Sequence, residues 1–229
     1  MLTSRRYMLL ILTLLSAMNQ LDRQLVNILI EPIRQEFALS DVQIGLLSGL
    51  AFAIIYSIFS IPASLYVMNS ARKPMLAVSA CVWGSMTVAS GFAQTYGHLI
   101  AARLGVGLGE AGGMPPSHAM ISDRFDPNER ASAMATWASG VNIGILLAFF
   151  GGGLIGQLYG WRAAFICAGA LTVLIALILQ FTVQEPSRLE TRASAPPLDI
   201  AALRSFLRTL WADRVLVHVF AGATLASLV

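Results

Sequence analysis

Charged residues and cysteines are scarce in this chain. Lysine, arginine, aspartate and glutamate make up 12% of the 229 residues, whereas a soluble domain has about 25%. Hydrophobic residues reach 56%, and the mean hydropathy is +0.70. This composition excludes an ordinary soluble domain and favours a membrane protein. The two cysteines, Cys81 and Cys167, have no CxxC spacing, so we expect two buried structural thiols rather than a disulfide or a metal site.

Signatures of enzymes are missing as well. The sequence has no HExxH motif and no Ser/His/Asp or Cys/His arrangement, so we expect no enzymatic activity, no cofactor and no metal. Residues 107–112 match the G-x-G-x-x-G fingerprint of dinucleotide-binding proteins, but that fingerprint needs a preceding strand and a βαβ unit. Here it lies inside a 24-residue apolar segment, so we interpret its glycines as sites of close helix packing. Glycines at four-residue spacing predict the same use: Gly45 and Gly49, Gly109 and Gly113, Gly140 and Gly144, and Gly152, Gly156 and Gly160.

Long apolar blocks are the main feature that is present. A membrane-spanning helix needs ~20 mostly apolar residues. Six blocks reach this length, and a seventh, residues 215–229, has only 15 residues and stops where the chain stops. We predict an all-α, polytopic membrane protein with a six-helix bundle over residues 1–183. A cytoplasmic linker over 184–214 would contain an amphipathic helix, and residues 215–229 would begin a truncated seventh transmembrane helix. The six blocks long enough to span are residues 7–30, 42–67, 75–94, 98–121, 132–157 and 162–183.

The distribution of basic residues predicts the orientation in the membrane. Cytoplasmic loops of membrane proteins are enriched in lysine and arginine. With the N-terminus inside, ten basic residues lie in cytoplasmic segments and only Arg34 and Arg162 lie in outer loops. We therefore expect an integral, multi-pass protein with a cytoplasmic N-terminus, located in the inner (plasma) membrane if the organism is bacterial. This topology explains the net charge of +3 without a nucleic-acid partner.

Two pairs of opposite charges lie inside predicted spans. Asp22 and Arg23 lie late in the first apolar block, and Arg103 and Glu110 lie in the fourth. At 1.5 Å rise per residue, Asp22 lies ~12 Å from the outer end of its helix, Arg103 ~8 Å and Glu110 ~18 Å. These depths predict that Asp22 pairs with Arg103 and that Arg23 pairs with Glu110. Asn19 lies about one helical turn before the first pair.

Charges at membrane depth are costly, and they usually serve a function. In a functional interpretation, Asp22 or Glu110 takes up or releases a proton as its surroundings change. Arg23 and Arg103 then act as counter-charges or bind an anionic group. In a structural interpretation, the ion pairs only fix the packing of the helices.

Three short motifs fall within or beside these spans. The first is Asn-Gln-Leu-Asp-Arg at residues 19–23, and the second is Arg-Leu-Gly-Val-Gly-Leu-Gly-Glu-Ala-Gly-Gly at residues 103–113. The third is Ser-Asp-Arg-Phe at residues 122–125, followed by Glu-Arg at 129–130. With the six spans, these motifs resemble the N-terminal half of a major facilitator superfamily transporter, most closely its spinster-like branch. The resemblance covers nearly the whole chain.

The resemblance implies a secondary active transporter, either a symporter or an antiporter, with proton coupling and alternating access. Its cargo would be an amphipathic lipid-like molecule or an organic anion, bound between the two six-helix halves of a twelve-helix fold. Its partners would be membrane lipids, this small-molecule or lipid-like substrate, and a C-terminal half or second protomer. The resemblance assigns proton coupling and substrate binding to Asp22, Arg23, Arg103, Glu110 and Asn19. It assigns the cytoplasmic gating loops to Arg72, Lys73, Asp123, Arg124, Glu129 and Arg130.

Two features depart from the family pattern. The family's loop between the second and third helices usually carries an Asp-Arg pair before its basic cluster. Here those positions are Met68 and Asn69, and only Arg72 and Lys73 of the cluster remain. The second six-helix half is also missing, so we expect the chain to be a fragment or to pair with a second chain. The alternative function is a non-transporting, truncated membrane module whose ion pairs are only structural.

Overall fold

The computed structural model describes residues 4–185, together with Arg208 and His218. The chain forms two compact units, Met1–Glu190 and Thr191–Val229, and almost all of the second unit lies outside the described residues. The same is true of the linker predicted for 184–214 and the helix start predicted for 215–229, apart from residues 184, 185, 208 and 218.

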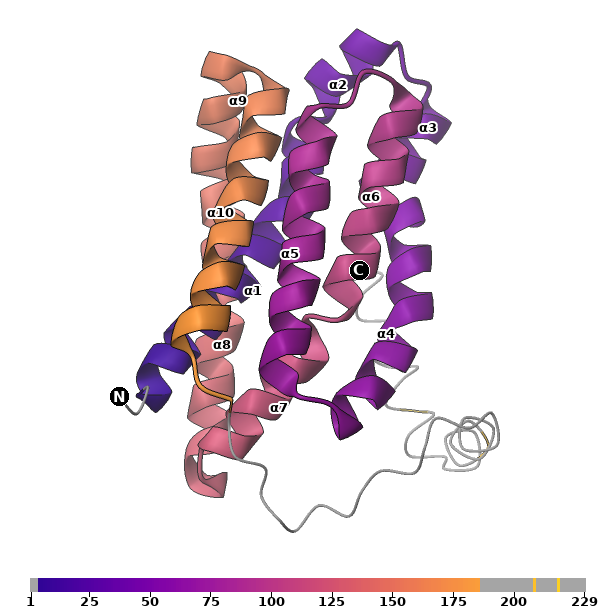
Figure 1. The fold of residues 1–229 in the computed structure, drawn as a ribbon. Helices are drawn as coiled ribbons and strands as arrows, with labels where there is room; N and C mark the ends of the chain where they lie inside the picture. The colour runs from indigo at the N-terminus through magenta and orange to yellow at the C-terminus, as the bar shows by residue number, and fades with distance from the viewer. Residues whose placement is uncertain (1–3, 186–207, 209–217, 219–229) are drawn as a thin grey trace. The chain divides into compact units, whose positions relative to one another are not determined.

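Residues 4–185 fold into helices joined by short turns, with no strand in this range, which confirms the all-α prediction (Figure 1). Most elements fall into six long helical units, and a short helix connects the first two. The first three units are α1 (Arg5–Ile28); α3 (Asp41–Gly45) with a π-helical stretch (Leu46–Leu50) and α4 (Ala51–Asn69); and α5 (Arg72–Gly91). The other three are α6 (Tyr96–Ala111) with α7 (Met114–Arg124); α8 (Pro127–Leu147) with a π-helical stretch (Ala148–Gly152) and α9 (Gly153–Tyr159); and α10 (Trp161–Thr182). The short connecting helix is α2 (Ile30–Phe37).

Four of these helical units are long and apolar enough to cross a membrane. The first unit, α1, has 24 residues but carries four charged side chains, and α6 has only 16 residues before the chain turns. Charge and a break therefore weaken the apolar signal in the two units that hold the predicted ion pairs. The four clearly apolar stretches are Asp41–Val67, Arg72–Gly91, Pro127–Tyr159 and Trp161–Thr182.

The fourth predicted span is not one continuous helix. It ends as α6 at Ala111, turns through Gly112 and Gly113, and resumes as α7 at Met114. Two prolines at the start of α7 explain the break, because Pro115 and Pro116 have no N–H to donate to the preceding turn. The fourth predicted span is therefore two helices joined by a turn.

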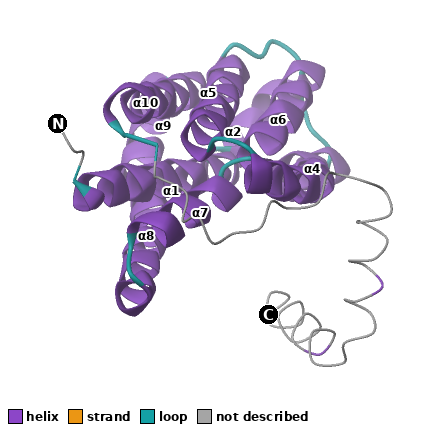
Figure 2. Ribbon diagram, turned by 60° about the horizontal axis from the view of Figure 1, so that its bottom comes forward, coloured by secondary structure: helices purple, strands orange, loops and turns teal. Residues whose placement is uncertain are grey.

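The first helix lies between α8 and α10 and is largely buried (Figure 2). Glycines on α8 allow its backbone to approach α1. A Cβ added at Gly140 would lie 2.5 Å from the Thr13 carbonyl oxygen, and one at Gly144 would lie 2.3 Å from the Ala17 carbonyl oxygen. Both distances are shorter than any real contact, so the two helices fit together only because these residues lack side chains.

Other glycines of the four-residue pattern have different uses. The packing prediction is wrong for Gly45 and Gly49, where an added Cβ would meet nothing within 4 Å. Gly160 also has no near neighbour, but its φ of 86° forms the turn between α9 and α10, and only glycine adopts that region readily. Four-residue spacing therefore marks a helix contact only where a second backbone lies opposite.

The prediction of two buried thiols is wrong for Cys167. Its side chain is exposed on α10, whereas Cys81 on α5 is half-buried. The neighbours Phe165 and Ala168 face the interior, so Cys167 lies on the outward face of the helix. For a spanning helix this face meets lipid, where an apolar thiol is at no disadvantage.

Candidate functional site

The centre of the bundle holds a buried ion pair between α1 and α6. Asp22 and Arg103 are each only 2% exposed. The guanidinium donates from Nη1 to Asp22 Oδ2 at 3.0 Å and from Nη2 to Asp22 Oδ1 at 3.2 Å. Such a two-pronged arrangement fixes both groups in position as well as neutralising them. The ring of Phe165 on α10 covers the guanidinium at 5.3 Å, which shields the pair from lipid.

A hydroxyl group from α5 completes the surroundings of Asp22. Thr87 Oγ1 lies 2.7 Å from Asp22 Oδ1 and 2.9 Å from the backbone carbonyl of Trp83. Thr87 is itself only 1% exposed. Three helices, α1, α5 and α6, therefore meet at this one carboxylate.

The second ion pair lies beside the first but opens to one side. Arg23 donates to Glu110 Oε2 from Nε at 2.8 Å, and its Nη2 lies 2.8 Å from the same oxygen. Glu110 is buried, and its other oxygen, Oε1, has no hydrogen-bond partner among the described residues. In contrast, 34% of the Arg23 side chain is exposed. Two aromatic rings of α4 lie against the guanidinium, Phe52 at 4.6 Å and Tyr56 at 5.0 Å, a cation–π arrangement that stabilises a charge away from water.

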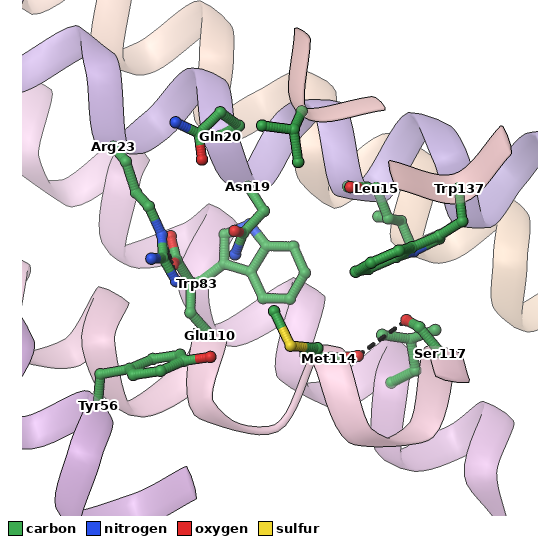
Figure 3. Close-up of a pocket in the computed structure, with 14 residues that line it drawn as sticks. Leu15, Asn19, Gln20, Arg23, Tyr56, Trp83, Glu110, Met114, Ser117 and Trp137 are labelled. Atoms are coloured by element: carbon green, nitrogen blue, oxygen red, sulfur yellow. Dashed lines mark hydrogen bonds and ion pairs between the residues drawn. The ribbon is translucent and has the colours of Figure 1, made fainter. Parts of the chain in front are cut away.

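A cavity of about 100 Å³ borders this second pair. Figure 3 shows Arg23 and Glu110 directed toward each other at one side of the cavity, with Trp83 and Trp137 lining other parts of it. The wall thus combines one accessible cation, one buried carboxylate and large aromatic surfaces. A small molecule that carries a negative charge, together with hydroxyl groups or a ring, matches this wall. The polar lining residues are Ser16, Asn19, Gln20, Arg23, Tyr56, Glu110 and Ser117.

The structure contains the two predicted ion pairs, Asp22 with Arg103 and Arg23 with Glu110. Asn19 is half-buried and lines the cavity, so all five residues of the predicted site come from the same region. The sequence interpretation missed Thr87 and the aromatic residues of α4 and α5. A threonine and aromatic side chains in apolar spans give no distinctive signal, because what they contact depends on which helices are neighbours.

The predicted gating residues lie at the end of the bundle that holds the start of α1, here termed the N-terminal end. Arg72 is buried and ion-paired with Asp123 of α7, and its Nη1 donates to the Ala119 carbonyl at 3.1 Å. Glu185 binds the start of α5, accepting from the backbone N–H groups of Arg72 at 2.7 Å and Lys73 at 2.8 Å. This cap was missed by the sequence interpretation, although Ala71, which precedes the first residue of α5, has no side chain that could cap the helix.

The remaining gating residues also make contacts within the bundle. Lys73 Nζ donates to the Gln180 carbonyl at 3.0 Å, which ties α5 to the end of α10. Glu129 at the start of α8 is ion-paired with Arg5 of α1. Arg130 Nε donates to the Phe125 carbonyl at 3.0 Å, and Arg124 ends α7.

A separate cluster closes the opposite end of the bundle. Glu36 of α2 accepts hydrogen bonds from Trp161 Nε1 at 2.8 Å and Arg162 Nη1 at 2.7 Å. Arg162 also donates to the Ala93 carbonyl at 2.9 Å. The hydrogen bond from Arg162 holds the pKa of the Glu36 carboxyl below its ordinary value of 4.5, and the Trp161 indole acts in the same direction.

This lowered pKa predicts a pH-dependent contribution to stability. A carboxyl whose pKa is depressed by folding stabilises the folded state above its unfolded value and loses that contribution as the pH falls through the folded value. We expect the melting temperature of the detergent-solubilised protein to decrease as the pH drops below about 4.5. The decrease should be less steep in Glu36→Gln. The contribution is modest because the Arg162 and Glu36 side chains are 37% and 40% exposed to solvent. Identical pH profiles for the two proteins would contradict a role for Glu36 in closing this end.

Comparison with known proteins adds independent information. The profile of the Major Facilitator Superfamily matches residues 12–229. An MFS-type efflux pump of Mycolicibacterium smegmatis is 34% identical over 173 residues, which cover 76% of this chain and 40% of the pump. The D-galactonate transporter of Escherichia coli O6:H1 is 29% identical over 198 residues, covering 85% of this chain and 45% of the transporter.

Solved structures show the same likeness. A bacterial homologue of the human lysosomal transporter Spinster, in an inward-facing and occupied conformation, has a TM-score of 0.74 and 34% identity, covering 81% of this chain and 45% of that chain. In the inward-facing, unoccupied conformation the TM-score is 0.77, with 32% identity over 91% of this chain and 49% of the other. The chain therefore spans less than half the length of each of these two relatives and of both Spinster-homologue chains.

Proposed function

The chain belongs to the major facilitator superfamily and is an integral membrane protein, and from this premise we propose that it acts as the N-terminal half of a proton-coupled transporter for organic anions. The family and the relatives named above are transporters, not enzymes. The mechanism is alternating access, in which two six-helix halves rock about a cargo site between them. The second half comes from further sequence or from a second copy, with residues 184–214 as a cytoplasmic linker and 215–229 as the start of the seventh helix.

The Arg23–Glu110 pair is the observation that carries the proposal. Arg23 binds Glu110 through one carboxylate oxygen only, and its side chain is partly open to the cavity. An anionic cargo that binds this guanidinium competes directly with Glu110. A buried carboxylate that loses its counter-charge is costly unless it takes up a proton. Cargo binding and proton binding are therefore linked through neighbouring atoms. Asp22 and Arg103 form the second ion pair of this charge network, and Asn19 adds a neutral hydrogen-bonding group.

In this mechanism the N-terminal end of the bundle faces the cytoplasm. Basic side chains at that end support it, because Arg5, Arg6, Arg72 and Lys73 all lie there. The contacts of Arg72 with Asp123 and of Glu185 with α5 then hold the cytoplasmic end of this half together while it moves as a unit.

Organic anions are favoured over lipid-like cargo by the cavity wall. Its only accessible charge among the described lining residues is the Arg23 guanidinium, whose planar fork suits a carboxylate. Among relatives, the D-galactonate transporter acts on a hydroxylated organic acid by name, which makes D-galactonate a reasonable first probe.

We expect Arg23→Lys to reduce D-galactonate uptake by about tenfold or more in proteoliposomes with an imposed proton gradient. Lysine keeps the charge but loses the planar fork, and one hydrogen bond to a charged group contributes about 1.5–3 kcal/mol. Arg34→Lys is the matched control, because Arg34 forms an exposed pair with Asp41 at the opposite end of the bundle. Equal uptake by both variants and the unaltered protein would contradict anion binding at Arg23, and uptake of neutral or cationic probes alone would contradict the cargo class.

A further inference from the structure

We propose that Thr87 is a positioning residue that acts as a hydroxyl switch for protonation of Asp22, holding the carboxyl in both its ionised and its neutral forms. This inference rests on the proposed proton coupling and assigns a role to a residue on α5, outside the two helices that carry the charges. It follows from the donor and acceptor properties of the groups around Asp22.

The partners of ionised Asp22 are all donors. Arg103 contributes two N–H groups, at 3.0 and 3.2 Å, and Thr87 contributes its hydroxyl at 2.7 Å. A carboxylate accepts only, so this set suits the charged form. With the group 2% exposed, water does not supplement these bonds.

Neutral Asp22 has a different requirement, because its new O–H group needs an acceptor. Arg103 has no acceptor atom and stays protonated at any ordinary pH. Of the groups that contact Asp22 in the described part of the chain, Thr87 alone has lone pairs to offer. Leaving a buried O–H without an acceptor is unfavourable, so protonation of Asp22 depends on this hydroxyl.

Thr87 has a second acceptor available for its own proton. Its Oγ1 lies 2.9 Å from the Trp83 carbonyl, one turn earlier on α5. The hydroxyl carries one hydrogen, which points to Asp22 Oδ1 while that group is ionised. When a proton binds Oδ1, the Thr87 hydrogen rotates to the Trp83 carbonyl and Oγ1 accepts from the new O–H. Each hydrogen keeps one acceptor throughout, and the step breaks no covalent bond in Thr87.

The charges around this switch come from two helices. Arg103 and, further along the same helix, Glu110 face Asp22 from α6, and Arg23 follows it on α1. From α5 the facing group is the neutral Thr87, and from α10 it is the uncharged ring of Phe165 against Arg103. Thr87 thus adjusts the hydrogen bonds of Asp22 without altering the charge of the site.

Infrared spectroscopy tests the switch without any cargo. The C=O band of protonated Asp22 is identified in the natural, full-length protein in lipid as the band that Asp22→Asn removes. In Thr87→Val, which keeps the shape but loses the hydroxyl, we expect this band to move to higher frequency because the carboxyl O–H has lost its acceptor. Thr87→Ser restores a hydroxyl and should restore the band, a rescue that a merely space-filling role does not require. If valine prevents folding, Thr87→Ala serves as the second variant.

Uptake measurements separate this inference from the proposed function. With D-galactonate as the probe and an imposed proton gradient, we expect Thr87→Val to lower the rate about tenfold, the effect of about 1.4 kcal/mol, and Thr87→Ser to stay near the unaltered rate. If Asp22→Asn removes coupling while Thr87→Val leaves both the infrared band and the rate unchanged, the switch is wrong and the proposed function stands. If no proton binds Asp22 at any pH at which the protein is folded, the switch is wrong, while proton coupling through Glu110 still stands.

Discussion

Replacing Arg103 with glutamine should lower the free energy of unfolding by about 3–5 kcal/mol, the range measured when one partner of a buried ion pair is removed. The reason is that Asp22 stays ionised or must bind a proton in a site with almost no access to water. Thr87 still donates to one oxygen, but the other oxygen loses Arg103 Nη1, its one partner in the described part of the chain. Denaturation in mixed detergent micelles provides the measurement.

A double variant is the matched control for this prediction. Asp22→Asn combined with Arg103→Gln leaves two neutral amide groups that can bond to each other, so most of the lost stability should return. Proton coupling should not return, because no titratable carboxyl remains at position 22. Additive losses from the two single substitutions would contradict a direct interaction between these residues.

Gly144→Ala should destabilise the bundle by about 3 kcal/mol, at the upper end of the usual cost of overpacking. The added Cβ would lie 2.3 Å from the Ala17 carbonyl oxygen and 2.9 Å from Gln20 Cβ. A backbone oxygen cannot rotate away as a flexible side chain can, so α1 and α8 must separate. Because α1 carries Asp22 and Arg23, we also expect a shift of the ion pairs and a loss of transport activity.

Gly151→Ala is the control, since Gly151 belongs to the helical unit that includes α8 and an added Cβ there meets nothing within 4 Å. Alanine is favoured over glycine within a helix by roughly 0.5–1 kcal/mol, so this variant should be as stable as the unaltered protein or slightly more stable. Unfolding midpoints in detergent compare the two. Equal stabilities of the two variants would mean that the α1–α8 contact is looser than the structure indicates.

The depths of the charged residues were predictable because helical rise is nearly constant. Counting residues from the ends of two apolar blocks placed Asp22 near Arg103 and Arg23 near Glu110, as the structure contains them. Apolar block length likewise predicted the helical units, since a membrane span has a minimum length. These are properties of one helix at a time.

Properties that depend on neighbouring helices were not predictable in this way. Thr87 became part of the site only because α5 lies against α1 at the height of Asp22. The same limit explains the glycines, since Gly144 faces the α1 backbone while Gly45 faces nothing, at identical spacing. The turn at Gly112 and Gly113 depends on local prolines, but the surfaces it packs against, Ser79 and Trp83, belong to another helix.

The two ion pairs differ in a way that bears on mechanism. The Asp22–Arg103 pair is enclosed on all sides, whereas the Arg23–Glu110 pair has one partner open to the cavity. Each pair also has one buried atom without a hydrogen-bond partner in the described residues, Arg103 Nε in the first and the acceptor Glu110 Oε1 in the second. An ion pair that only fixed helix packing would gain from being fully enclosed and fully bonded. The second pair instead leaves both a cation and an acceptor available, which favours cargo and proton binding over a purely structural role.

Cargo-driven proton movement tests the central claim most directly. The full-length natural protein is reconstituted in proteoliposomes that contain a pH-sensitive dye, and D-galactonate and related organic anions are added outside without a proton gradient. We predict a change in internal pH on addition of a transported anion, and its loss in Asp22→Asn and in Glu110→Gln while the anion still exchanges across the membrane. An unchanged proton signal in both variants, or anion transport without any proton movement in the unaltered protein, would show that the buried charges only hold the helices together.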